Sequence, residues 1–172
     1  MRIVLWIVIA LVLVVVLIAV IGSPLPKAHQ ASRSARFAVP PQTLYAVITD
    51  VDRFPEWRKD VKRIERLPDR DGRPAWIEHG SNGAIPLRME RAEAPSLVVG
   101  RIGEGLAFGG TWTYRIKPVP EGSELTITED GEIYNPIFRF LARFVFGYEA
   151  TMTSYLTALQ ARVATGGPRT PS

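Results

Sequence analysis

One uninterrupted apolar segment near the N-terminus constrains this chain more than any other feature. Every residue from Ile3 to Ile21 is apolar, and 16 of these 19 residues are Leu, Ile or Val. A helix of this length spans about 28 Å, close to the roughly 30 Å hydrocarbon core of a bilayer. The segment has no polar face that could lie against water. We therefore predict that residues 1–22 form a transmembrane anchor.

A cleaved signal peptide is the alternative for this segment. The apolar region of a signal peptide normally spans about 7–15 residues before a small-x-small cleavage site, which is shorter than the segment here. Pro24 follows Ser23, the candidate cleavage residue, and would obstruct the cut. The sequence thus favours an uncleaved, single-pass anchor.

The basic residues around the anchor bear on its orientation. Only Arg2 precedes the apolar segment, whereas Lys27, Arg33 and Arg36 follow it. Because positive charge beside a transmembrane helix is retained in the cytoplasm, this asymmetry favours a cytoplasmic domain over a periplasmic or extracellular one. The absence of cysteine fits either compartment.

The charge pattern argues against nucleic acid as a partner. The chain has a net charge of +4, and its basic residues are densest in residues 58–73. Four acidic residues are interleaved there with seven basic ones, as on solvated strands and turns rather than on a surface that follows phosphates. A mildly basic surface suits anionic lipid headgroups better. We expect the membrane, and no nucleic acid, as a partner.

The rest of the chain predicts one folded domain (31–164) between a Pro-containing tether (23–30) and a disordered tail (165–172). Apolar alternation between Gly-, Pro- and Asp-rich turns predicts strands at 31–39, 61–67, 75–80, 85–92, 97–102, 111–117 and 124–133. Two short helices are expected between the first two strands, and one long helix from Asn135-Pro136 to about Val163. This order favours an α+β domain in which a curved, seven-stranded antiparallel sheet wraps around the long C-terminal helix.

Two segments of the chain resemble a known superfamily. Val39–Trp57 runs V-P-P-Q-T-L-Y-A-V-I-T-D-V-D-R-F-P-E-W, and Asn135–Leu159 runs N-P-I-F-R-F-L-A-R-F-V-F-G-Y-E-A-T-M-T-S-Y-L-T-A-L. With the order of elements, they resemble the START/Bet v 1-like (SRPBCC) superfamily, and most closely its polyketide cyclase/dehydrase-type lipid-transport branch. The resemblance covers about residues 30–163. It implies a helix-grip fold with a cavity between sheet and helix that binds lipids, sterols or polyketides and, in some members, catalyses a reaction.

Few residues offer catalytic or metal-binding chemistry. There is no cysteine, and the two histidines, His29 and His79, lie fifty residues apart without the spacing of a metal site. His79, next to Glu78, is a candidate general base, but a strand histidine with its ring in solvent is the simpler interpretation. We therefore predict no catalytic residue, no metal and no cofactor.

Large aromatic side chains are the stronger signal. An indole N–H or a phenol O–H can orient a ligand in an apolar cavity, although the same side chains can also fill a solid core. The resemblance favours a cavity for the set as a whole. The predicted ligand-binding residues are Trp57, Trp76, Trp112, Tyr148 and Met152.

The segment 138–146 is apolar on more faces than packing against one sheet requires. Its phenylalanines can enter the headgroup boundary while two arginines one turn apart reach lipid phosphates. Packing against the short helices is an equally weighted alternative. The predicted membrane-contact residues are Phe138, Arg139, Phe140, Arg143 and Phe146.

These predictions lead to one function and two alternatives. We expect a membrane-anchored binding module that holds a lipid or other apolar small molecule between sheet and helix. A cyclase- or dehydrase-type enzyme acting in the same cavity is the first alternative, and polar groups facing the cavity would favour it. A ligand-free interaction scaffold is the second, and a filled core would favour it.

Overall fold

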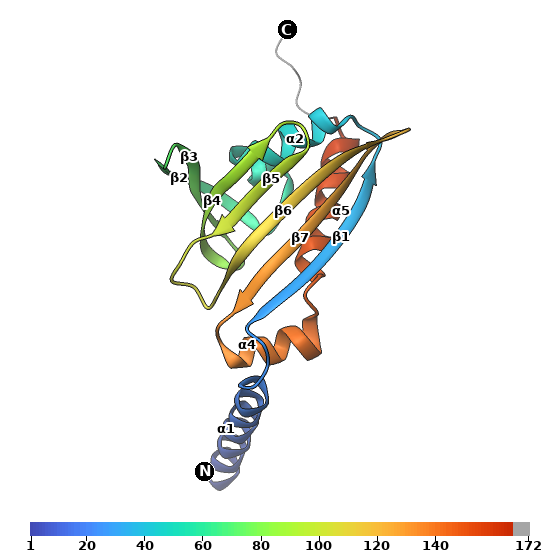
Figure 1. Cartoon of the computed structure of the whole chain (residues 1–172). Coiled ribbons are helices and arrows are strands. Elements are labelled where there is room, and N and C mark those ends of the chain that lie inside the picture. Colours follow the sequence, from blue (N-terminus) through green and yellow to red (C-terminus); the bar gives the residue numbers. More distant parts are fainter. Residues whose placement is uncertain (167–172) are drawn as a thin grey trace.

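The computed structural model describes residues 1–166, in which a long N-terminal helix leads into a strongly curved antiparallel sheet (Figure 1). Within these residues the sheet has seven strands in the order β1-β7-β6-β5-β4-β3-β2. The strands are β1 (Ala28–Phe37), β2 (Val61–Arg70), β3 (Arg73–Gly80), β4 (Gly83–Glu93), β5 (Leu97–Ile102), β6 (Phe108–Val119) and β7 (Gly122–Ile133). Of the tail predicted to be disordered (165–172), residues 167–172 lie outside the described part of the chain.

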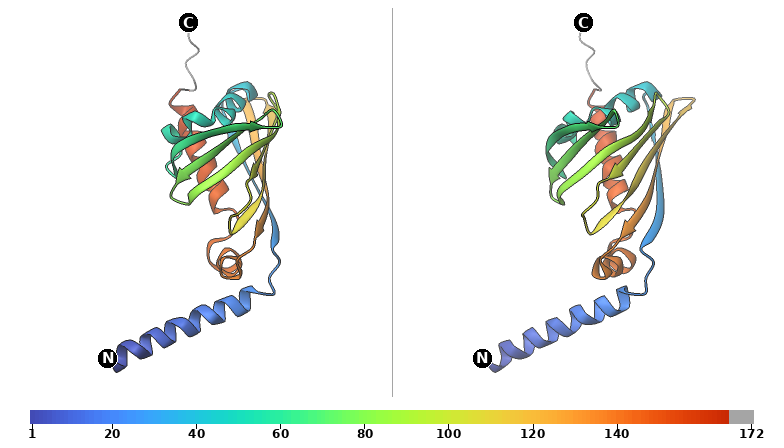
Figure 2. Two further views of the ribbon diagram at one scale, coloured as in Figure 1. Left: turned by 90° about the vertical axis from the view of Figure 1, so that its left-hand side faces the viewer. Right: turned by 60° about the vertical axis from the view of Figure 1, so that its left-hand side comes forward.

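The helices other than the first gather on the concave side and at the ends of the sheet (Figures 1 and 2). The first helix is α1 (Arg2–Gly22), and the others are α2 (Pro41–Thr49), η1 (Val51–Arg53), α3 (Phe54–Trp57), α4 (Pro136–Leu141), η2 (Ala142–Phe146) and α5 (Ala150–Ala164). α5 lies along the concave face. This arrangement confirms the predicted α+β architecture, a curved seven-stranded antiparallel sheet around a C-terminal helix.

The core lies between α5 and the concave face. The inner side of α5 carries Met152, Tyr155, Leu156 and Leu159, which follow the helical spacing and are all buried. The other buried members of this cluster are Phe37, Leu44, Val47, Ile48, Val98, Ile116, Leu125 and Ile127. Each large apolar side chain contributes about 1.5–3 kcal/mol when fully buried, so this cluster fixes α5 on the sheet. A second cluster under α3 consists of Val51, Phe54, Val61 and Trp76.

The C-terminal helix is broken, which corrects the prediction of one continuous helix from residue 135 to about 163. Its start is as expected, because the Asn135 Oδ1 accepts the Ile137 N–H at 2.8 Å and caps α4. The π-helical turn η2 follows, and α5 begins only at Ala150. Gly147 lies between them with a φ of +74°, which a right-handed helix cannot contain and which glycine adopts at no steric cost.

Two strand boundaries also differ from the prediction. β1 begins at Ala28 rather than at residue 31, because residues 28–30 already pair with β7, so the connection between α1 and the sheet is shorter than the predicted tether. β2 continues through Pro68 to Arg70 instead of turning there. Pro68 is tolerated because β2 is an edge strand, where a residue without a backbone N–H need not break a hydrogen bond to a neighbouring strand.

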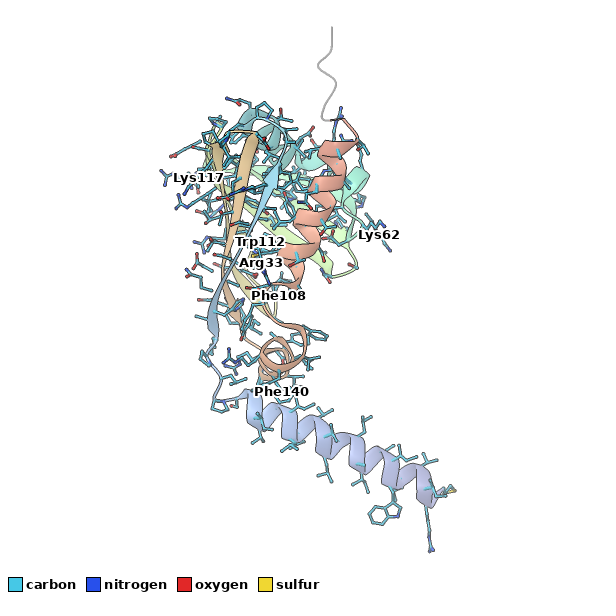
Figure 3. All side chains as sticks on the ribbon, turned by 90° about the vertical axis from the view of Figure 1, so that its right-hand side faces the viewer. Arg33, Lys62, Phe108, Trp112, Lys117 and Phe140 are labelled. Carbon is cyan, nitrogen blue, oxygen red and sulfur yellow. The ribbon has the colours of Figure 1, made fainter. Side chains whose placement is uncertain are left out.

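The end of α1 packs tightly against α4 (Figure 2). A Cβ on Gly22 would lie 1.9 Å from the Pro136 carbonyl oxygen, so glycine alone fits at this contact. The Arg139 Nη1 donates to the Leu25 carbonyl oxygen at 3.0 Å, and Phe140 lies at the same junction (Figure 3). α1 therefore meets the domain through a packed contact with α4.

Candidate functional site

A cavity of about 740 Å³ lies between the concave face of the sheet and the broken C-terminal helix. Its lining is mostly apolar. The helical wall comes from α4, η2 and the first turn of α5, with Phe138, Leu141, Ala142, Phe146, Gly147, Tyr148, Ala150 and Thr151. The break at Gly147 places this wall away from the axis of α5, and the cavity occupies the part of the concave face that α5 leaves uncovered.

Most of the opposite wall is formed by inward-facing residues of the strands β3 to β7, and β1 and β2 contribute His29 and Val61. Because side chains alternate between the two faces of a strand, every second residue contributes. This wall includes Trp76 and Glu78 of β3, Ile85, Leu87 and Met89 of β4, Val98, Gly100 and Ile102 of β5, Trp112 and Tyr114 of β6, and Glu129 of β7. A Cβ added to Gly100 would meet no atom within 4 Å, so the space in front of β5 is open.

Arg58, which follows α3, lies in the cavity wall between two carboxylates. Its guanidinium pairs with Asp60 at 2.6 Å and with Glu78 at 3.0 Å, and it stacks over the rings of Phe54 and Tyr155. Burial alone would lower the pKa of Arg58, but attraction to Glu78 and Asp60 outweighs it and raises that pKa above its ordinary value. Arg58 therefore stays charged, and protein carboxylates already neutralise it.

Two tyrosines lie beside this ion-pair network. The ring centroids of Tyr114 and Tyr155 are 5.5 Å apart, and burial raises the pKa of both phenols well above the ordinary value. Tyr155 is 5% exposed, and its hydroxyl has no hydrogen-bond partner among the described residues. Both phenols remain protonated over the physiological pH range, so this part of the cavity offers neutral polar groups.

A second polar group lies where the cavity approaches α4. The His29 Nε2 of β1 is 3.8 Å from the Glu129 Oε1 of β7, and the Tyr148 ring stacks on the imidazole with centroids 4.2 Å apart. A Cβ on Gly131 would lie 2.4 Å from the imidazole, so this glycine makes room for His29. Burial lowers the pKa of His29, and burial raises the pKa of Glu129 against the opposing effect of the Trp112 side chain.

The cavity wall reaches the surface at α4 and η2. Phe138 and Phe146 both line the cavity, yet they are 48% and 67% exposed. With Tyr134, Phe144 and Val145, which are also exposed, they form what we call the aromatic face. This face spans the residue before α4, α4 itself and η2, and α1 packs against α4, so α1 and the aromatic face lie at the end of the domain where α4 and η2 line the cavity. Figures 1 and 2 show α1 meeting the domain at this end.

The predicted ligand-binding residues fall into two groups. Trp76, Trp112 and Tyr148 line the cavity. Trp57 and Met152 do not belong to its lining. Met152 is fully buried in the main core, and Trp57 packs edge-on against the rings of Phe54 and Tyr155.

The predicted membrane-contact residues also divide. Phe138, Phe146 and Arg143 are exposed, whereas Phe140 is half-buried against Phe144. The structure corrects the prediction for Arg139. This residue is 7% exposed and hydrogen-bonded to the Leu25 carbonyl, so its guanidinium does not face outward to lipid phosphates. The amphipathic spacing could not show this, because the contact comes from a segment more than a hundred residues earlier in the chain.

Sequence reasoning missed most polar residues of the cavity. Glu78 carried a signal, because it lies two residues from Trp76 on the same face of β3, and Glu129 likewise continues the inward row of Ile127. His29 falls within the predicted tether (23–30), whereas in the structure β1 begins at Ala28 and contains it. His79 faces away from the cavity lining and pairs with Glu65 at 2.8 Å, as the interpretation of a solvent-side histidine predicted.

Comparisons with known proteins agree on the fold. A family model described as polyketide cyclase / dehydrase and lipid transport matches residues 28–164. A START superfamily protein from Mycobacterium smegmatis has 19% identity, with 80% of this chain and 98% of that chain covered and a TM-score of 0.65. The ZhuI aromatase/cyclase from Streptomyces sp. R1128 has 16% identity, coverage of 82% and 99%, and a TM-score of 0.63. Norcoclaurine synthase from Thalictrum flavum has 9% identity, coverage of 81% and 87%, and a TM-score of 0.62. No curated protein sequence matches the chain.

Proposed function

Because this chain belongs to the polyketide cyclase / dehydrase and lipid transport family, within the START/SRPBCC superfamily, we propose that it is a membrane-anchored module that binds a lipid or other apolar small molecule in its cavity. One observation carries the proposal: Phe138 and Phe146 belong both to the cavity wall and to the exposed aromatic face beside the anchor. A ligand that passes between these rings moves between the cavity and the bilayer without crossing open water.

The dimensions and lining of the cavity support this proposal. A volume of about 740 Å³ falls within the roughly 300–1,000 Å³ of small-molecule sites, and such sites are mostly apolar with a few placed polar groups. Each methylene of a ligand removed from water contributes about 0.8 kcal/mol, so an acyl chain or a sterol needs no hydrogen bond for much of its affinity. The polar groups are then available to orient one end of the ligand.

The N-terminal helix supports the membrane location in the proposal. α1 has 21 residues, which at about 1.5 Å each give a length near that of a hydrocarbon core, and its apolar side chains are exposed along the helix. The basic residues Lys27, Arg33 and Arg36 follow α1, which favours a cytoplasmic location for the domain.

The aromatic face is the proposed contact between the domain and the bilayer surface. Phe138, Phe144 and Phe146 are exposed next to the packed junction of α1 and α4, so the same bilayer that holds α1 is within their reach. Aromatic rings favour the headgroup boundary, and the exposed Arg143 can extend to lipid phosphates. The packed junction keeps the cavity mouth directed at the membrane.

A space-filling substitution at Gly100 tests the binding function. Gly100 lines the cavity, and a Cβ added there would meet no protein atom within 4 Å, so Gly100→Phe should place its ring in the cavity. Val99→Phe, on the other face of the same strand, is the matched control. Binding of a pyrene-labelled fatty alcohol to the full-length protein in detergent is measured by energy transfer from the cavity tryptophans, Trp76 and Trp112.

We expect saturable binding by the wild type and by Val99→Phe. Gly100→Phe should weaken binding by at least about tenfold, which corresponds to roughly 1.4 kcal/mol. The melting temperatures of all three proteins should agree within a few degrees. Absence of saturable binding by the wild type, or equal binding by Gly100→Phe, contradicts the proposed function.

An enzyme is the second candidate, favoured by the placement of His29 in the cavity wall near Glu129. A neutral imidazole beside a carboxylate is suited to accept a proton from a bound ligand. Mass spectrometry of ligand extracted from purified wild type and from His29→Gln separates the two functions. A carrier yields the same molecule from both proteins, whereas an enzyme that uses His29 accumulates a different, unconverted molecule in the variant.

A further inference from the structure

The charged side chains that line the cavity carry more negative than positive charge. The lining carboxylates are Asp60, Glu78, Glu129 and Glu132, and the lining basic side chains are Arg58 and His29. Burial lowers the pKa of His29, which favours the neutral imidazole and leaves Arg58 as the one permanent positive charge of the described lining. The cavity is therefore apolar with an acidic balance.

Arg58 is not available to an anionic ligand. It already pairs with Asp60 and Glu78, and its side chain and that of Glu78 are only 13% and 9% exposed. A ligand carboxylate or phosphate that took over Arg58 would leave Glu78 buried without a cation. Breaking a buried pair in this way is strongly unfavourable, because the remaining charge is neither paired nor hydrated.

Glu129 has a different environment, because no permanent cation neutralises it. Its one basic neighbour within 4 Å among the described residues is the His29 imidazole, at 3.8 Å, and its side chain is 18% exposed. Its position is fixed by pairing opposite Trp112 in β6 and by the packing of His29 against Gly131. A carboxylate thus faces the cavity with hydrogen-bond acceptor capacity that a ligand can use.

We propose that the cavity takes amphipathic ligands whose polar head is a hydroxyl or an amine and discriminates against carboxylates and phosphates, with Glu129 as the residue that determines this selectivity. The proposal rests on the binding function proposed above and specifies its ligand class. A hydroxyl or an ammonium group donates to the Glu129 carboxylate. An anionic head brings two negative charges together in a site of low polarity, which is unfavourable.

Three pyrene-labelled probes of equal chain length, ending in a carboxylate, a hydroxyl or an amine, test this selectivity. Their binding to the full-length protein in detergent is measured by energy transfer from tryptophan, and the signal of Gly100→Phe is subtracted as the contribution of the micelle. Glu129→Gln removes the charge and keeps the shape of the side chain. Asp130→Asn makes the same change at the next residue of β7, which bonds Gln30 outside the cavity.

We expect the wild type and Asp130→Asn to bind the alcohol and the amine at least about tenfold more tightly than the acid, and Glu129→Gln to bring the acid within about threefold of the alcohol. Equal binding of acid and alcohol by the wild type overturns the selectivity while the binding function stands, and this comparison holds even if Glu129→Gln does not fold. Unchanged selectivity in folded Glu129→Gln overturns the role of that residue. If Gly100→Phe does not reduce the energy-transfer signal of any probe, both the binding function and the selectivity are wrong.

Discussion

The concave face of the sheet has a packed half and a hollow half, and the same strands supply both. On β7, Leu125 and Ile127 are fully buried under α5, whereas Glu129, two residues further along the same face, lines the cavity. On β6, Ile116 is buried in the core and Trp112 lines the cavity. The strands continue without interruption from one half to the other, so the helix that covers them, and not the sheet, determines where the cavity lies.

The break at Gly147 is what separates the two halves. α5 fills the concave face from Ala150 onward, while α4 and η2 form a separate wall next to the end of α1. The hollow half therefore lies at the end of the domain where α1 meets α4, and the packed half supplies the stability. Substitutions in the packed half should change folding, and substitutions in the hollow half should change binding.

The largest effect is expected from a proline in the packed half. Leu156→Pro removes a backbone hydrogen bond of α5 at a cost of about 3 kcal/mol or more, and it removes a buried leucine worth roughly 2–5 kcal/mol. The sum is comparable to a typical domain stability of about 5–15 kcal/mol. Circular dichroism should show loss of the cooperative thermal transition, whereas Thr157→Ala on the exposed side of α5 should keep it. An unchanged transition in Leu156→Pro would show that α5 does not hold the fold together.

A pair of truncations compares the two halves directly. Leu125→Ala in the packed half creates a new cavity and should cost about 2–5 kcal/mol in the free energy of unfolding. Ile102→Ala in the hollow half enlarges a cavity that already exists, so it should cost about 1 kcal/mol or less, because few packing contacts are lost. Denaturant titration of both proteins measures the difference. Equal costs would mean that the two halves are packed alike.

The membrane contact is expected at the hollow end alone. A chain without residues 1–22 should still bind vesicles of anionic lipid through the aromatic face, and Phe144→Asp together with Phe146→Asp should abolish that binding. Thr153→Asp with Thr157→Asp places the same charges on the exposed side of α5 and should weaken binding only slightly. Vesicle sedimentation measures the effect. Equal losses in the two double variants would place the contact elsewhere.

The smallest expected effect is the pH-dependent contribution of the Glu129 carboxyl to the stability of the folded protein. Burial raises the pKa of Glu129, so the folded state binds a proton more tightly than the unfolded state, and stability from this group is lost as pH rises from about 4.5 through the raised pKa. Glu129→Gln should therefore raise the melting temperature by a few degrees at neutral pH, and this gain should shrink as pH falls toward 4.5. A gain that is independent of pH would show that the charge of Glu129 is not its cause.

The sequence predicted the apolar N-terminal helix, the seven strands and three residues that line the cavity, because these depend on local composition and alternation. The alternation in β3 and β6 placed Trp76 and Trp112 on the inner face, where they line the cavity. The break in the C-terminal helix was less predictable, because a single glycine costs only about 1 kcal/mol inside a helix and tertiary contacts decide whether the helix continues. Arg139 was misplaced for a similar reason, since its partner Leu25 precedes the sheet.

The cavity itself depends on contacts that no local pattern records. His29 and Glu129 are a hundred residues apart and meet because β1 joins the sheet beside β7. Arg58 carries no periodic signal, and of its two partners Asp60 immediately precedes β2 and Glu78 lies on β3. These residues became visible only when the pairing of the strands was known.

Native mass spectrometry of the full-length protein purified from membranes can detect a ligand held in the hollow half. If the hollow half holds an apolar ligand, the wild type and Val99→Phe should carry a noncovalent additional mass in the range of a lipid or a similar small molecule, and Gly100→Phe should lack it. A wild type of bare polypeptide mass, or an additional mass carried equally by all three proteins, would contradict the account.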